Sequence, residues 1–132
     1  MAISEEARRN REALFGNHRS TLAGADPEFI QAFDNWAFGE VPKESVIDAR
    51  TRLMVQLAAI IACQAVNEYR VMLGGALNVG VTPVEVKEIV YQAVPYVGIA
   101  RAFDFLNATN EILGARGVKL PLEGQSTTTP ET

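Results

Sequence analysis

Apolar residues recur at helical spacing along most of this chain, and the strict alternation that is typical of strands is almost absent. The clearest helix begins after Thr82, where Pro83 and Glu85 complete a capping box with proline in the first turn. One face of that helix is apolar, and largely opposite it fall Glu85, Lys87, Glu88 and Gln92. The pattern therefore predicts an amphipathic helix from residue 83 to about residue 97.

Capping residues and glycine stops mark further helices. Ser4 caps a first helix over residues 5–15, which ends at the following glycine. Asp26 and Pro27 start a second helix, which is expected to end near Gly39. The others are expected over residues 46–64, 67–79 and 99–115. The sequence therefore predicts an all-α fold of about six helices.

The two middle helices are predicted to lie at the centre of the fold. A short connection joins the helices expected over residues 46–64 and 67–79, so they should form a central antiparallel pair. The second half of the first of them is apolar nearly all the way round, and such a helix must be covered on all sides. A six-helix monomer of this size covers it with difficulty, which favours a homo-oligomer.

Length and composition indicate a single folding unit. A chain of 132 residues with 48% hydrophobic content suits one compact domain. We expect that domain to be all-helical and to span residues 1–117. The remaining residues, 118–132, are rich in Thr, Pro and Glu with little to bury, and they are predicted to form a flexible tail.

Charge and cysteine content exclude several classes of protein. Twelve Lys and Arg against sixteen Asp and Glu give a net charge of −4, so the basic field of a nucleic-acid binder is lacking. The longest apolar run, residues 53–63, contains Gln56 and is too short to cross a membrane. A single cysteine and an N-terminus without an apolar core indicate a reducing, cytoplasmic setting.

Several segments resemble a known family. They are RNREALFG, NWAFGEV, the apolar helix, GALNVGVTPVEVKEIVYQA and YVGIARA. Together, over roughly residues 8–113, they resemble the carboxymuconolactone decarboxylase family, which is similar in fold to the alkyl hydroperoxidase D proteins. The resemblance implies an all-helical chain that assembles into trimers or hexamers.

In the peroxidase branch of these proteins, the resemblance implies a Cys-x-x-Cys pair and a histidine on the fourth helix, with a glutamate on the third. The corresponding positions here hold Ala65, Glu68, Met72 and Leu53, so that motif is absent. Cys63 has no partner thiol and is expected to be a small buried residue of the core or of a pocket lining. A single-cysteine peroxide reductase that uses an external thiol stays an alternative, provided that Cys63 faces a pocket.

The decarboxylase branch implies a small lactone or cyclic carboxylic acid as substrate, with no metal or organic cofactor. Such a site needs a cation to hold a carboxylate, donors for the developing oxyanion and an acid for the carbanion. Arg70 and Arg101 are candidate cations, although either could instead form a surface or intersubunit ion pair. Tyr69 and Tyr96 are candidate donors.

The acid is harder to assign, because Met72 occupies the position where the decarboxylases carry histidine, and methionine cannot transfer a proton. Glu68 is the first candidate, since burial would raise its pKa. His18, in a loop after the first helix, is the second. A pocket lining is expected from Trp36, Glu40, Cys63, Met72 and Tyr96, where ordinary helix packing is the competing interpretation.

The sequence therefore favours a cofactor-free lyase that acts on a small cyclic carboxylic acid. A thiol-dependent peroxide reductase is one alternative. A non-catalytic binding or scaffold protein that kept the fold after losing its reactive side chains is the other.

Overall fold

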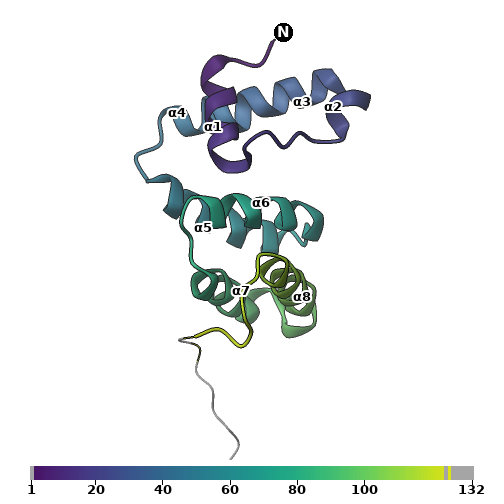
Figure 1. Cartoon of the computed structure of the whole chain (residues 1–132). Coiled ribbons are helices and arrows are strands. Elements are labelled where there is room, and N and C mark those ends of the chain that lie inside the picture. The colour runs from purple at the N-terminus through teal and green to yellow at the C-terminus, as the bar shows by residue number, and fades with distance from the viewer. Residues whose placement is uncertain (1, 124, 126–132) are drawn as a thin grey trace, which may run out of the picture. The chain divides into compact units, whose positions relative to one another are not determined.

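The computed structural model describes residues 2–123 and 125, and every regular element in this part of the chain is a helix (Figure 1). The all-α prediction is therefore confirmed. The chain divides into two compact units, Met1–Ala49 and Arg50–Thr132, and each is described by itself below. The expected single domain over residues 1–117 stays a prediction.

The first unit begins with α1 (Glu5–Phe15), which has the predicted bounds. Ser4 caps this helix, since its side chain accepts a hydrogen bond from the backbone N–H of Ala7 at 3.1 Å. The helix ends at Gly16, whose φ of 59° is easiest for a residue without a side chain. Local sequence signals therefore set both ends of α1.

A short α2 (Leu22–Ala25) leads to α3 (Pro27–Asp34), the π-helical segment η1 (Asn35–Glu40) and α4 (Val41–Lys43). These last three elements follow one another without a break, so the predicted stop near Gly39 is wrong. Gly39 is instead buried where η1 packs on α1, and Asn10 donates a hydrogen bond to the Phe38 carbonyl at 2.7 Å. The helix therefore continues past Gly39, because α1 packs against it there.

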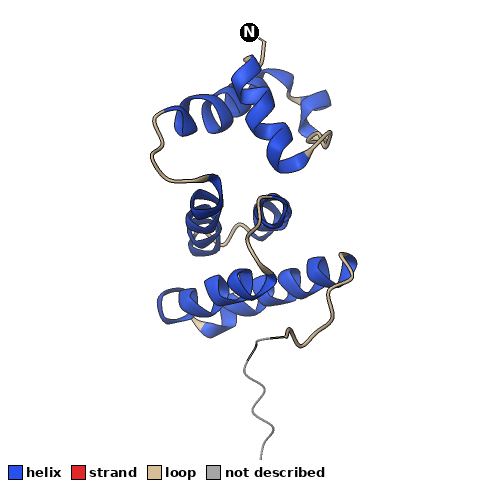
Figure 2. Cartoon of the chain, turned by 60° about the vertical axis from the view of Figure 1, so that its left-hand side comes forward, coloured by secondary structure: helices blue, strands red, loops and turns tan. Residues whose placement is uncertain are grey.

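The second unit contains α5 (Ala49–Ala62), α6 (Val66–Asn78), α7 (Pro83–Val97) and α8 (Ile99–Ala115). In Figure 2, α5 and α6 are seen nearly end-on, and α7 and α8 run across them. Because a short turn joins α5 to α6, the two run in opposite directions, and α8 packs against both α6 and α7. Their inner faces form the core, whose largest fully buried side chains are Tyr69, Phe105, Leu53, Leu57, Ile61, Leu73 and Leu113.

The capping box predicted for α7 is present in full. Thr82 accepts from the Glu85 backbone, and the Glu85 carboxylate accepts from the Thr82 backbone. Arg50, at the start of α5, forms an ion pair with the same carboxylate. The cap therefore also ties α7 to α5.

The start of the predicted tail packs on this unit. Leu122 is buried, and the side chain of Gln125 donates a hydrogen bond to the Tyr91 hydroxyl of α7 at 2.9 Å. The Gln125 side chain also accepts a hydrogen bond from the Leu122 backbone N–H at 2.9 Å. Residues 124 and 126–132 lie outside the described residues, and for them the flexible tail stays a prediction.

Candidate functional site

The predicted acid and the first predicted cation lie on α6. Glu68 is exposed, so the described residues of this chain do not provide the burial that was expected to make it an acid. Arg70 is half-buried and forms an ion pair with Glu111 of α8, at 3.0 Å between nitrogen and oxygen. That pair is the competing surface role anticipated for this arginine, and Arg70 must leave it to hold a substrate carboxylate.

Between these two residues, Tyr69 points the other way, into the core. Its hydroxyl lies 2.6 Å from the Thr109 hydroxyl, which itself donates to the Phe105 carbonyl at 2.6 Å. The Tyr69 ring packs edge-on against Phe105. Burial raises the pKa of the Tyr69 hydroxyl, and the bond to Thr109 opposes that rise. Tyr69 thus fixes α6 to α8 and does not offer its hydroxyl at the surface.

The two sulfur-containing candidates have different environments. Met72 is buried in the core of the second unit, as expected for an apolar replacement of the family's histidine. The prediction that Cys63 is buried is wrong, because its side chain is exposed just after the end of α5. The apolar run before it indicated burial, but the helix ends at Ala62 and the chain turns at Gln64, which has a φ of 60°.

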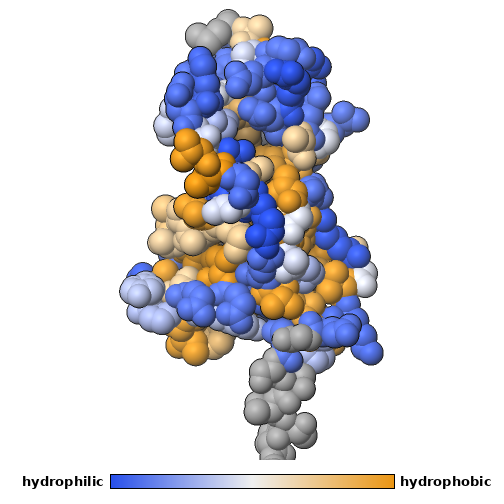
Figure 3. Space-filling view, turned by 90° about the vertical axis from the view of Figure 1, so that its left-hand side faces the viewer, coloured by the Kyte–Doolittle hydropathy of each residue, from blue (hydrophilic) through white to orange (hydrophobic). Residues whose placement is uncertain are grey.

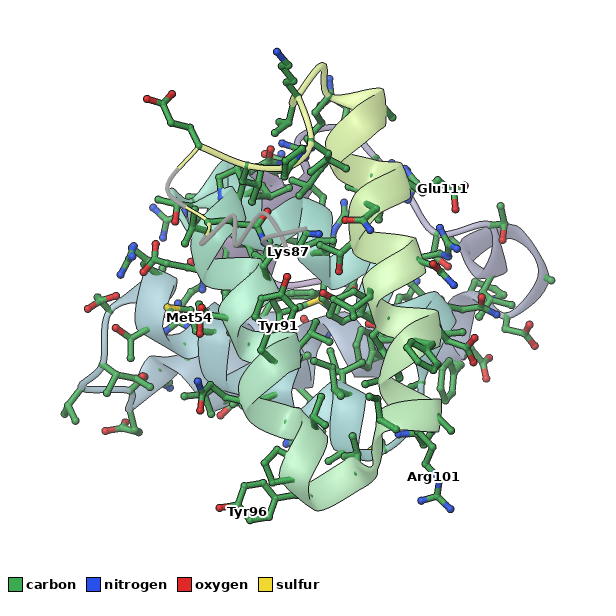
Figure 4. The ribbon with its side chains drawn as sticks, turned by 90° about the horizontal axis from the view of Figure 1, so that it is seen from below. Met54, Lys87, Tyr91, Tyr96, Arg101 and Glu111 are labelled. Carbon is green, nitrogen blue, oxygen red and sulfur yellow. The ribbon has the colours of Figure 1, made fainter. Side chains whose placement is uncertain are left out.

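Arg101 and Tyr96 lie near the corner where α7 meets α8. Both side chains are exposed, and Tyr96 is 90% exposed. Figure 4 shows them pointing away from each other and outward from the two helices. The described residues of this chain therefore do not bring Arg101, Tyr96 and Glu68 into one cluster.

The remaining candidates belong to the first unit. His18 is exposed in the loop after α1, and Trp36 and Glu40 are exposed on η1. Trp36 is 64% exposed, so it neither packs inside this unit nor lines a cavity within it. The buried aromatic residue of this segment is instead Phe38, which packs edge-on against Phe15 and Phe33.

The same unit holds a buried ion pair that was not predicted. The Arg11 Nε lies 3.4 Å from Asp34, and another Arg11 nitrogen donates to the His18 carbonyl at 2.8 Å. Burial raises the pKa of the Asp34 carboxyl, even though Arg11 opposes this rise. The role of Arg11 in this unit is structural.

A second buried cation lies on α7. Lys87 was predicted to fall largely opposite the apolar face, and that prediction is wrong, since the residue is only 7% exposed. Burial lowers the pKa of its ammonium group. One signal was available in the sequence: Lys87 precedes Val90 and Val94 at helical spacing, which places it at the edge of the apolar face.

Hydrophobic side chains also reach the surface of the second unit. Among them are Val55, Tyr96, Ile99 and Phe103, each more than half exposed. Figure 3 shows apolar patches among the polar ones on the face that it displays.

Within the described residues, no three His, Cys, Asp or Glu side chains gather closely enough to hold a metal ion. None of the described helices is both long and apolar enough to cross a bilayer.

Comparison with known proteins adds independent information. The sequence model of the carboxymuconolactone decarboxylase family matches residues 27–111, from the start of α3 into α8. The 4-carboxymuconolactone decarboxylase of Acinetobacter baylyi is 28% identical over 95 residues, which cover 69% of this chain and 71% of that protein. The nitrosuccinic acid decarboxylase npaB of Metarhizium robertsii is 31% identical over 78 residues, which cover 59% of this chain and 54% of that protein.

The matched region contains most of the features described above. It includes the π-helical segment, the apolar α5, the capping box of α7 and the Tyr69–Thr109 hydrogen bond. It also agrees with the resemblance seen in the sequence. Because the match covers well over half of the chain, this protein belongs to the carboxymuconolactone decarboxylase family.

Proposed function

We propose that this protein is a cofactor-free decarboxylase of a small organic acid, with a cyclic or lactone acid as the first candidate substrate. The observation that carries the proposal is the family match from α3 into α8, together with two relatives that are both decarboxylases by name. A lyase of this kind needs only binding groups and one proton donor from the protein.

The reaction that we propose breaks one carbon–carbon bond. Carbon dioxide leaves, and the electron pair of that bond delocalises into the unsaturated lactone as a dienolate. A proton then returns to carbon. Fixed hydrogen-bond donors near the lactone oxygen lower the barrier, because charge develops there only in the transition state.

Arg70 and Glu68 are the residues that we assign to this chemistry. Arg70 would hold a substrate carboxylate by exchanging it for the carboxylate of Glu111. Glu68, two positions earlier on the exposed part of α6, would supply the proton that methionine at position 72 cannot. Arg101 is the second candidate anchor, and His18 the second candidate acid.

A site on this surface requires cover, since water weakens electrostatic interactions with a substrate. We propose that a second copy of the chain supplies it in a homo-oligomer, a trimer or a hexamer. The exposed apolar side chains Val55, Tyr96, Ile99 and Phe103 support this assembly, because water contact with large apolar residues is unfavourable. Light scattering on the purified chain measures its mass, and a monomer would contradict the assembly.

The test of the proposed activity uses two acids, 4-carboxymuconolactone and nitrosuccinic acid, with release of carbon dioxide as the readout. We expect turnover of at least one of them, or of a related small acid, without added metal or cofactor. Glu68→Gln should reduce kcat by about 100-fold or more, as expected for loss of a general acid. Glu6→Gln removes another exposed carboxylate, from α1, and should leave the rate unchanged.

Equal rates for Glu68→Gln and the unmodified protein would exclude Glu68 as the acid. Absence of decarboxylation across a panel of lactone and dicarboxylic acids, by a folded protein, would contradict the proposed activity itself. It would favour the binding or scaffold alternative.

The exposure of Cys63 favours a second candidate, thiol-dependent peroxide reduction. In that reaction the thiolate attacks a peroxide, an alcohol leaves, and an external thiol reduces the sulfenic acid. Consumption of an organic hydroperoxide that disappears in Cys63→Ser would support it. Equal consumption by both proteins would exclude it.

A further inference from the structure

Two ion pairs between helices of the second unit differ in how firmly their carboxylates are held. Arg50 of α5 pairs with Glu85 of α7. The Glu85 carboxylate also accepts a hydrogen bond from the Thr82 backbone in the capping box. Arg70 of α6 pairs with Glu111 of α8 at 3.0 Å, and among the described residues it is the one hydrogen-bond donor to that carboxylate. The Glu111 carboxylate is therefore held by a single contact.

The exposure of the two carboxylates differs in the same sense. The side chain of Glu111 is 69% exposed, whereas that of Glu85 is 29% exposed. Figure 4 shows Glu111 on the side of α8 that faces away from α7. An ion pair with so exposed a carboxylate is weak, because water and salt screen it. Another carboxylate can therefore replace Glu111 at Arg70 at little cost in free energy.

The Arg70 guanidinium can bind a carboxylate more fully than it binds Glu111. It carries five N–H donors in a planar fork, and within the described part of the chain it donates to Glu111 through Nη1 alone. A free carboxylate can align with the fork and accept two parallel hydrogen bonds. Such a ligand gains one hydrogen bond that Glu111 does not make.

The two helices that carry the pair do not have to move for this exchange. The Tyr69 hydroxyl of α6 lies 2.6 Å from the Thr109 hydroxyl of α8. Arg116, at the end of α8, donates to the Gly74 carbonyl of α6 at 3.2 Å. These bonds hold α6 against α8 on either side of the ion pair. The exchange then requires only rotation of the Glu111 side chain, which is fast for an exposed residue.

We propose that Glu111 is a built-in competitor for Arg70 and thereby sets the affinity of this protein for its carboxylic acid substrate. Without substrate, the Glu111 carboxylate occupies Arg70. When a substrate carboxylate binds, Glu111 rotates into water and the substrate accepts from both arms of the fork. This inference rests on the proposed function, because it takes Arg70 as the anchor of the substrate.

A competitor of this kind has a kinetic signature. A tethered carboxylate acts like a fixed concentration of free carboxylate near Arg70. It lowers the apparent affinity for a ligand by the fraction of protein in which Arg70 is already occupied. The chemical step follows binding and does not involve Glu111. Removing the competitor should therefore lower KM and leave kcat unchanged.

The first experiment measures kcat and KM for the acid that the protein decarboxylates. Glu111→Gln removes the charge and keeps the size of the side chain, and we expect KM to fall about threefold, as suits a weak exposed pair. The matched control Asp104→Asn removes an exposed carboxylate from the same helix and should leave KM unchanged. An unchanged KM in Glu111→Gln, or an equal fall in Asp104→Asn, would overturn the proposal.

The second experiment needs no turnover, so it separates this inference from the proposed activity. Succinate is titrated into the full chain at constant ionic strength, and NMR follows the Arg70 Nε–H signal, which is identified by its loss in Arg70→Met. We expect succinate to shift this signal and to bind Glu111→Gln about threefold more tightly than the unmodified protein.

The two possible failures give different results in this titration. Equal succinate affinity for both proteins, or no shift in either, would overturn the role of Glu111 whether or not an acid is decarboxylated. Tighter binding to Glu111→Gln without any decarboxylation would support the competitor and contradict the proposed activity alone.

Discussion

Each unit of the molecule buries a cation, and the two cations have different surroundings. In the first unit, Arg11 lies against Asp34 and donates to the His18 carbonyl. In the second, Lys87 has no carboxylate partner among the described residues. Both residues are less than one-tenth exposed. Burial alone therefore does not indicate what a charged residue does.

The difference separates a charge that its own chain compensates from one that its described residues do not. A buried charge whose partners come from its own chain stabilises a fixed arrangement, and removing one partner leaves the other uncompensated. A buried charge without such a partner is costly, because no opposite charge of the chain offsets the loss of water. The predictions below test this distinction, beginning with the largest expected effect.

Breaking the internal pair should have the largest effect. Asp34→Ala leaves the Arg11 guanidinium buried with only a carbonyl acceptor, and we expect a loss of about 3 kcal/mol in the free energy of unfolding. Urea unfolding followed by circular dichroism measures it. A change below about 1 kcal/mol would mean that water or relaxation already compensates Arg11, and the contrast with Lys87 would lose its basis.

Removing the Lys87 cation should instead stabilise the folded protein. Lys87→Met replaces a residue that is only 7% exposed by an apolar one, so we expect a gain on the order of 1 kcal/mol in the free energy of unfolding near neutral pH. The folded protein holds the Lys87 proton less tightly than the unfolded chain does, because burial lowers its pKa.

The pH dependence of that gain has a definite sign. The stability of the unmodified protein, relative to Lys87→Met, should rise as the pH increases from the lowered pKa toward the ordinary lysine value of about 10.4. Unfolding of both proteins at several alkaline pH values measures the difference. A constant difference across that range would show that the ammonium is not destabilising the folded state.

Removing the buried hydrogen bond between Tyr69 and Thr109 should have an intermediate effect on stability. Tyr69→Phe removes the hydroxyl that donates to Thr109 but leaves the Thr109 bond to the Phe105 carbonyl. We expect a loss of about 1 kcal/mol. Chemical unfolding checks it, and Tyr91→Phe, which removes a more exposed hydroxyl, serves as the control.

Removing the capping carboxylate of α7, that of Glu85, should have a smaller effect on stability. Bonds from Arg50 and from the Thr82 backbone hold the pKa of Glu85 below its ordinary value. The stabilisation is therefore complete above about pH 4.3 and is lost as the pH falls through the lowered pKa. Glu85→Gln should remove on the order of 0.5 kcal/mol of acid-sensitive stability, because the pair is partly exposed.

The exposed pair on α6 should contribute least. Arg70→Met removes the ion pair with Glu111, and we expect a change below about 0.5 kcal/mol in stability. The same variant should impair substrate binding, so its effect on KM should greatly exceed its effect on unfolding. An Arg70→Met protein that is clearly destabilised and keeps its KM would assign this arginine to structure.

Local signals in the sequence predicted most helix ends correctly. Ser4 and Gly16 bound α1, and Thr82 with Glu85 starts α7, because each acts through bonds within a few residues of itself. The helix expected over residues 46–64 is shorter in the structure, at Ala49–Ala62. Apolar Val46 and Ile47 suggested an earlier start, yet both are exposed before the helix begins.

The environments of the candidate site residues were harder to predict. Cys63 follows an apolar run and is nonetheless exposed, whereas Lys87 and Arg11 are charged residues that are buried. The π-helical form of η1 had no signal in the sequence, although Trp36 and Glu40 within it were singled out. In each case the outcome depends on what another helix presents at that position.

The sequence by itself determined the all-α fold, the order of the main helices and the family, because helical periodicity and capping act between near neighbours. Only the tertiary structure decided which charges are buried and which of them have partners. That outcome depends on contacts between residues far apart in the chain, such as Arg11 with Asp34 and Tyr91 with Gln125. The free energy of a buried charge is set by those contacts, which no local pattern encodes.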